Sequence, residues 1–202
     1  MIKPKKPIEI PMLMKGGMID LEHVEPIDFI IDNMLSPGLS MLAADPKIGK
    51  SWFSLLMCIC VSQGQKFLGY NTHKSNVLYL ALEDSDNRMK SRIKRIFDGD
   101  KLPDTFNYCI EINDLSNGFI EQMELVFQSM SDLRLIVVDT LQCIRGQYNN
   151  RDGGAYGYDY KEMNKLKAFA KKHNLAICYS LVYLNQNPFF FFKLNKIQDA
   201  SI

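Results

Sequence analysis

Paired cysteines, long apolar runs and a large excess of charge of one sign are all missing from this sequence. The five cysteines are odd in number and include no Cys-x-x-Cys pair, which argues against a disulfide framework or a zinc site and fits a reducing cytoplasm. The net charge of +1 provides no overall basic field that would attract nucleic acid. It does not exclude a local basic patch. No run approaches the roughly 18 apolar residues of a membrane span, so no membrane partner is expected.

The length and composition are typical of a single globular domain. A chain of 202 residues with 47% hydrophobic and 23% charged residues suits one α/β domain or slightly more. Residues 1–25 are rich in Pro, Gly and Met, and we expect them to form a loose N-terminal arm. The arm begins with basic residues but has no apolar stretch behind them, so it does not resemble a secretory signal.

From residue 39 onward, the sequence alternates between short apolar runs and segments with helical spacing. The apolar runs predict strands at 39–43, 77–82, 106–112, 133–138 and 175–182. Helices are predicted at 51–62, 85–97, 118–130 and 159–173, with a Gly- and Asn-containing loop over 146–157. This alternation predicts an α/β fold with a mostly parallel sheet and helices on both faces. Ligands of such sheets bind beyond the carboxyl ends of the strands.

A phosphate-binding loop is predicted between the first strand and the first helix. Its eight residues are Ala44, Asp45, Pro46, Lys47, Ile48, Gly49, Lys50 and Ser51. They match the pattern Gly-x-x-x-x-Gly-Lys-Ser/Thr except at Ala44, where alanine requires a negative φ or tolerates strain. In such loops, backbone N–H groups and the helix N-terminus cradle phosphates. Lys50 is expected to reach the β- and γ-phosphates of ATP, and Ser51 to help hold Mg²⁺.

Parts of this segment have alternative interpretations. The Gly-Lys-Ser triplet occurs by chance at helix starts, but here an apolar strand precedes the loop and an apolar helix follows it. Lys47 either adds a second positive charge near the phosphates or is a solvated loop lysine. Trp52, the only tryptophan, directly follows the loop. We group it with the nucleotide-binding residues, and packing is its other expected role.

Acidic residues end two of the predicted strands. Asp139 follows the apolar run 135–138, as in a Walker B strand, and is expected to bind Mg²⁺ through water. Glu83 ends the strand at 77–82 and is predicted to be the general base that polarises the attacking water. In the alternative, Glu83 and Asp84 lie at the N-terminus of a helix capped by Ser85 and stabilise the helix dipole. We favour catalysis for Glu83 and this helix-capping role for Asp84. Thr140 is either a γ-phosphate or DNA contact, or an ordinary polar loop residue, and Gln142 shares this ambiguity.

These motifs together resemble the RecA-type ATPases, and above all the RepA-like branch of phage and plasmid replicative helicases. The resemblance covers about residues 26–177, the predicted ATPase core. It depends on the segments SPGLSMLAADPKIGKSWFSLLM, VLYLALEDSDNRMKSRIKRI, LIVVDTLQ and DYKEMNKLKAFAKKHNLAI.

The resemblance implies a hexameric motor that depends on ATP and Mg²⁺ and acts on single-stranded DNA, with ATP bound between subunits. It implies catalytic roles for Glu83 and Lys50 and a metal-binding role for Asp139. Arg92 occupies the position of an arginine that lies close to the nucleotide base, and Arg88 is the alternative. A solvated basic helix face is an equally good interpretation of both arginines.

The sequence departs from the family pattern after residue 177. Residues 178–202 contain no histidine, although the family has a γ-phosphate-sensing histidine in this region, and residues 189–192 are four consecutive phenylalanines. We therefore expect 178–202 to be an atypical tail from a frameshifted or truncated product, which leaves the C-terminal part of the fold incomplete. A native variant tail that docks on a partner is the alternative.

The missing family features affect the expected activity. A neighbour's arginine finger contributes roughly 10³–10⁵ in rate in related systems, so we expect ATP binding with weak turnover. The alternative function is a nucleotide-binding regulatory or assembly module that is not stimulated by DNA.

Overall fold

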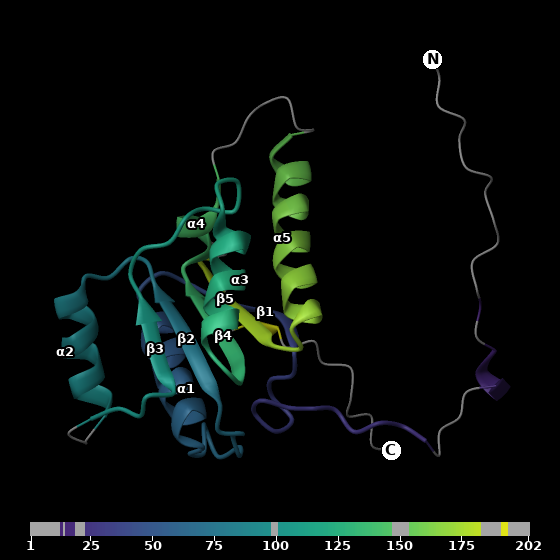
Figure 1. Ribbon diagram of the computed structural model, residues 1–202, viewed down its shortest axis with the longest axis horizontal. Helices are drawn as coiled ribbons and strands as arrows, with labels where there is room; N and C mark the ends of the chain where they lie inside the picture. The colour runs from purple at the N-terminus through teal and green to yellow at the C-terminus, as the bar shows by residue number, and fades with distance from the viewer. Residues whose placement is uncertain are drawn as a thin grey trace.

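A computed structural model describes residues 13, 15–18, 23–97, 101–146, 154–182 and 191–193. Its centre is a six-stranded sheet in the order β3-β2-β4-β5-β1-β6. Figure 1 shows the five strands β3, β2, β4, β5 and β1 side by side in this order. The strands are β1 (Gly38–Ala44), β2 (Asn76–Ala81), β3 (Phe106–Cys109), β4 (Leu133–Asp139), β5 (Ala176–Val182) and β6 (Phe191–Lys193). β1 to β5 pair in parallel, and β6 pairs antiparallel with β1 at the edge.

Helices cover both faces of this sheet, as the alternating pattern predicts. They are α1 (Lys50–Gln63), α2 (Asp86–Ile96), α3 (Phe119–Ser129), α4 (Leu141–Ile144) and α5 (Gly154–Lys172), and a short 3₁₀ helix, η1, spans Gly16–Met18. One hydrophobic cluster joins α1 and α2 to residues such as Leu42 and Val137. A second cluster joins α3, α4 and α5 to residues such as Ile136 and Ile177 on the opposite face. Adjacent residues of β4 thus point to opposite faces, and both faces are buried.

The parallel register brings the carboxyl ends of neighbouring strands to one edge of the sheet. Ala81 at the end of β2 pairs with Asp139 at the end of β4. Gly38 to Ala44 of β1 pair along the full length of β5, from Ala176 to Val182. The phosphate loop and both acidic strand ends therefore meet at this edge, where an open α/β sheet binds its ligands.

Two predicted boundaries differ from the structure. The helix expected at 159–173 begins at Gly154, so Gly154 and Gly157 belong to α5 and not to the preceding loop. A glycine in a helix interior costs about 1 kcal/mol relative to alanine. Packing of the buried Leu166 and Phe169 later in α5 supports the helix despite this cost.

The strand expected at 106–112 ends at Cys109. Among the described strands it pairs with β2 alone, and this pairing runs from Phe106 to Cys109, so the segment beyond Cys109 has no ladder to extend.

The predicted division at 177/178 falls inside β5. This strand continues to Val182 and lies between β4 and β1 in the sheet. The predictions for residues 1–12, 183–190 and 194–202, which include most of the arm and most of the tail, lie outside the described residues.

The described end of the N-terminal segment is attached to the amino-terminal edge of the sheet. Asp28 accepts a hydrogen bond from Arg134 of β4 at 2.6 Å and another from Asn174, just before β5, at 3.2 Å. Within the described ranges, no helix is both long and apolar enough to cross a membrane.

Candidate functional site

The predicted phosphate loop connects the end of β1 to the start of α1. Ala44 is the last residue of β1, is buried, and has the negative φ that alanine needs at this position. Lys47 and Gly49 adopt positive φ angles of 64° and 101°. These two residues turn the chain sharply, so that α1 begins directly after the loop. Gly49 is the N-cap and supplies no side-chain hydrogen bond to the first turn of α1.

The ammonium group of Lys50 is held against the loop that precedes it. Its Nζ donates hydrogen bonds to the backbone carbonyls of Ala44 and Asp45, each at 2.8 Å. Burial lowers the pKa of Lys50, while the nearby carboxylates of Asp139, Asp45 and Glu83 oppose this effect. The residue thus brings a cation to an otherwise buried position, with carboxylates close enough to affect its protonation.

A cavity of about 310 Å³ opens beside this lysine. It is lined by Pro46, Lys47, Gly49, Lys50, Ser51, Trp52, Glu83, Arg92, Asp139 and Thr140. The other three predicted phosphate-binding residues, Ala44, Asp45 and Ile48, lie outside this lining; Ile48 is 48% exposed. The fold therefore gathers residues from the loop, from α2 and from the ends of β2 and β4 around one hollow.

The acidic wall of the cavity is built from the ends of β2 and β4. The backbone N–H of Leu82 donates to the carbonyl of Asp139 at 3.0 Å, which joins the two strand ends. The hydroxyl of Thr140 donates to Glu83 Oε1 at 2.9 Å. Thr140 is buried and its bond restricts the Glu83 carboxylate to the cavity side. Gln142, considered together with Thr140 from the sequence, is exposed on α4 and does not line the cavity.

Asp139 is fixed by two hydroxyl groups from the neighbouring strands. Tyr79 of β2 donates to Oδ2 at 2.7 Å, and Ser180 of β5 donates to Oδ1 at 2.6 Å. Burial raises the pKa of Tyr79, and the negative charge of Asp139 raises it further, so the phenol remains a donor. Neither residue was predicted from the sequence. The available signal was that both lie on apolar strands, where a hydroxyl needs a partner.

Arg92 lines the cavity but is bound to a buried carboxylate. Its guanidinium forms an ion pair with Asp84, whose side chain is 4% exposed, and lies 5.7 Å from the ring centroid of Trp52. Arg88 also approaches Asp84, at 3.2 Å, but its side chain is 62% exposed and it is absent from the cavity lining. Ser85 is the N-cap of α2, as expected, and accepts a hydrogen bond from the backbone N–H of Arg88. Asp84 therefore serves as the counter-ion of Arg92 beside this helix start.

The chemistry of the cavity fits a nucleotide phosphate with a magnesium ion. Lys47, Lys50 and the N-terminus of α1 supply positive potential on one side, and Glu83 and Asp139 supply carboxylates on the other. The described residues contain no cluster of three or more His, Cys, Asp or Glu that could hold a metal by themselves. Magnesium usually keeps several waters and binds one or two carboxylates together with substrate phosphates, so this sparse acidic set suits it.

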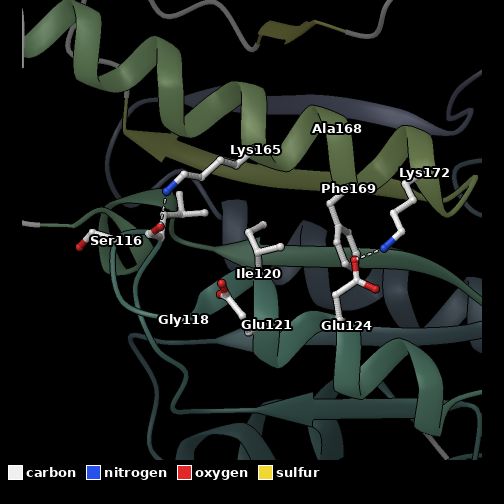
Figure 2. A pocket seen from close by; sticks show the side chains of 10 residues that line it. Ser116, Gly118, Ile120, Glu121, Glu124, Lys165, Ala168, Phe169 and Lys172 are labelled. Carbon is white, nitrogen blue, oxygen red and sulfur yellow. Dashed lines mark hydrogen bonds and ion pairs between the residues drawn. The ribbon is translucent and has the colours of Figure 1, made fainter.

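A second cavity, of about 450 Å³, lies between α3 and α5, on the face of the sheet opposite to α1 (Figure 2). Lys165 crosses it to donate to the Leu115 carbonyl at 2.7 Å, and Lys172 reaches Glu124 at 2.6 Å. Ile120 and Phe169 lie between these two bridges. None of the residues that line this cavity belongs to the phosphate loop or to the acidic strand ends, so the two hollows are separate.

Comparison with models of known protein families shows which family the chain belongs to. The model of the AAA_25 family, described as an AAA domain, matches residues 16–180, most of the sequence. The chain belongs to this AAA domain family. No curated protein sequence matches it.

A comparison with solved structures supports the same fold. One solved structure, whose title describes it as an ATPase domain, aligns with a TM-score of 0.52 and 15% sequence identity. The alignment covers 71% of this chain and 56% of that chain, so this chain spans little more than half of the length of that domain. The predicted RecA-type P-loop α/β fold is confirmed, and the chain is an AAA-type ATPase domain by family.

Proposed function

We propose that this domain binds ATP with Mg²⁺ in the 310 Å³ cavity and hydrolyses it. The observation that carries this proposal is the convergence of Lys50, Ser51, Glu83 and Asp139 on one hollow at the carboxyl ends of the strands. A P-loop lysine, a hydroxyl and two carboxylates are the groups that phosphoryl transfer to water requires.

The loop residues bind the phosphates. The free N–H end of α1 and the backbone turn at Lys47 and Gly49 face the cavity, where they can donate hydrogen bonds to phosphate oxygens. Lys50 leaves the Ala44 and Asp45 carbonyls and turns its ammonium toward the β- and γ-phosphates. The exchange replaces bonds from the ammonium to neutral carbonyls with bonds from the ammonium to charged phosphate oxygens.

The metal side of the site is formed by Ser51 and Asp139. When bound, Mg²⁺ neutralises negative charge on the phosphate oxygens during transfer. Ser51 would supply its hydroxyl as a ligand to the metal, and Asp139 would accept hydrogen bonds from metal-bound water, as the sequence predicts.

Glu83 is the proposed general base. Its Oε1 is held by Thr140, which leaves Oε2 free to accept a proton from a water molecule placed in line with the terminal phosphate. Thr140 serves as a positioning residue in this scheme because its hydroxyl orients the carboxylate. The pairing of Arg92 with Asp84 places a further cation beside the nucleotide, next to Trp52.

The physiological setting is proposed as DNA replication or recombination of a phage or mobile element, in a cytoplasmic compartment. The support is the sequence resemblance to RepA-like helicases, together with the AAA family membership. We propose a homo-oligomer, a hexamer as in that family, with single-stranded DNA as partner. Arg92 is the arginine that lines the cavity, and Asp84 already binds it. We therefore expect the isolated chain to turn ATP over slowly until a neighbouring subunit supplies an arginine.

The test combines nucleotide binding, mass and turnover. Mg-ATP affinity and molar mass in solution are measured together, and phosphate release is then followed with and without single-stranded DNA. Binding, ATP-dependent assembly and DNA-stimulated turnover support the motor. Binding and assembly without stimulation by DNA favour the regulatory or assembly module. A chain that does not bind Mg-ATP at all would refute the proposed function.

A further inference from the structure

The carboxylate of Asp139 is enclosed by hydroxyl groups that the sequence motifs do not include. Tyr79 is fully buried and Ser180 is 1% exposed, and each donates to a different oxygen of Asp139. Both hydroxyls come from strands that flank β4 in the sheet, one on each side. Asp139 is itself 4% exposed, and these two hydrogen bonds satisfy its oxygens on the side away from the cavity.

The sheet register explains why these three side chains meet. Tyr79 pairs with Val137, and Val137 pairs with Cys178, in the layer below the site. Asp139 and Ser180 lie two residues farther along their strands and therefore on the same face. That face is covered by α1, the helix that follows the phosphate loop. The tyrosine ring is long enough to bring its hydroxyl up from the lower layer to the aspartate.

The Tyr79 hydroxyl also lies close to the phosphate-loop helix. It is 3.4 Å from the backbone carbonyl of Ser51, the residue proposed to bind the metal through its hydroxyl. Tyr79 thus touches both sides of the proposed metal site, Asp139 in the sheet and Ser51 in α1. Its single proton is directed to Asp139, at 2.7 Å, because this is the shorter contact and the acceptor is charged.

We propose that Tyr79 and Ser180 are positioning residues that hold Asp139 for the metal. Each carboxylate oxygen uses one lone pair on a hydroxyl donor, which prevents the side chain from rotating. The remaining lone pairs are left for metal-bound water on the cavity side. Donors of this kind around a metal-binding carboxylate typically contribute about 10–100-fold to metal affinity. This inference rests on the proposed function.

The test separates metal binding from nucleotide binding. Affinity for a fluorescent ATP analogue is measured in EDTA and then during a Mg²⁺ titration, for the full chain and for Tyr79→Phe, Ser180→Ala and Asp139→Asn. We expect each hydroxyl deletion to raise the Mg²⁺ concentration at half-saturation about 10-fold or more. Affinity in EDTA is expected to stay at the wild-type value, because neither hydroxyl touches the phosphate loop's N–H groups. A residue with only a structural role would change both measurements or neither.

Matched controls remove the same atoms elsewhere. Tyr108→Phe removes a phenol hydroxyl that binds Asp86 in the first turn of α2, and Ser62→Ala removes a buried hydroxyl that donates to the Ile59 carbonyl. Both controls should leave the Mg²⁺ titration unchanged. Cooperative thermal unfolding of every variant verifies that it is folded before its titration is interpreted.

The outcomes distinguish this inference from the proposed function. If Asp139→Asn weakens the Mg²⁺ response but Tyr79→Phe and Ser180→Ala behave as wild type, the positioning role is wrong and the proposed site stands. If Asp139→Asn itself leaves the Mg²⁺ response unchanged, or if the wild type does not bind the analogue, the proposed site fails and the positioning role fails with it.

Discussion

Replacing Lys50 with alanine tests the nucleotide site most directly. The wild-type chain, at a Mg-ATP concentration of about 100 times Kd, should gain about 2.7 kcal/mol of stability. For a chain of 202 residues, each kcal/mol shifts the unfolding midpoint by about 2–4 °C, so Mg-ATP should raise the Tm by roughly 5–11 °C. This rise is the quantity to be compared between variants.

The structure indicates how much of this rise Lys50 supplies. Its Nζ makes two hydrogen bonds to loop carbonyls, and the same two donors are available for phosphate oxygens. Hydrogen bonds that involve a charged group contribute about 1.5–3 kcal/mol each. We take the lower value because the same donors already bind carbonyls in the free protein, so losing two bonds to phosphate costs about 3 kcal/mol. That loss weakens binding roughly 150-fold. At the same nucleotide concentration, the remaining stabilisation is about 0.3 kcal/mol, which corresponds to a Tm rise of about 1 °C.

Differential scanning fluorimetry or calorimetry with and without Mg-ATP measures this difference. The comparison uses the ligand-induced rise and not the Tm itself, because alanine also removes a buried cation and its carbonyl bonds from the free protein. Lys66→Ala, an exposed lysine just beyond α1, should retain the full rise. A Lys50→Ala variant whose Tm still rises by about 5 °C or more would place the ligand elsewhere and refute the reasoning.

Three further predictions concern catalysis, pH dependence and the core. Glu83→Gln should reduce phosphate release about 10²–10⁴-fold while Mg-ATP affinity is retained, and unchanged turnover would exclude it as the base. Lys172 and His173 lower the pKa of Glu124, so the stability from this group is present above the unfolded pKa and is lost as pH falls through the lower, folded pKa. Wild type and Glu124→Gln should therefore differ by about 0.2–1 kcal/mol near neutral pH and converge in acid, as measured by denaturant unfolding at each pH, whereas a constant difference would contradict the linkage. Leu42→Ala, at a fully buried position in β1, should cost about 2–5 kcal/mol, and a Tm within about 2 °C of wild type would show that the site is not tightly packed.

The local elements were predictable because hydrophobic periodicity is a property of short segments. The apolar runs at 77–82 and 133–138 correspond to β2 and β4, whose side chains are almost all buried. The strand at 106–112 and the helix at 159–173 were placed less well. In both cases the boundary depends on a partner element, namely the length of the β2–β3 ladder and the packing of α5, which no local window contains.

The predicted departure after residue 177 shows the same limit. The resemblance stated from the sequence ends there, yet the family model matches as far as residue 180, β5 continues to Val182 between β4 and β1, and Ser180 binds Asp139. A motif comparison measures similarity to other sequences. A segment joins a sheet when its backbone forms hydrogen bonds with neighbouring strands and its apolar side chains are buried, whether or not its sequence matches the family. The expectation that 178–202 is an atypical tail stays a prediction for the residues beyond the described part of β5.

By itself, the sequence determined the phosphate loop, the two acidic strand ends and the α/β alternation that brings them to one edge of a sheet. These features depend on residue type, short spacing and the direction of parallel strands. Only the tertiary structure decided that Asp84 holds Arg92, that Thr140 holds Glu83, and that Tyr79 and Ser180 hold Asp139. The sheet order β3-β2-β4-β5-β1-β6 places residues distant in sequence within hydrogen-bond reach. Their pairing depends on strand order and register, which the packing of the whole domain selects.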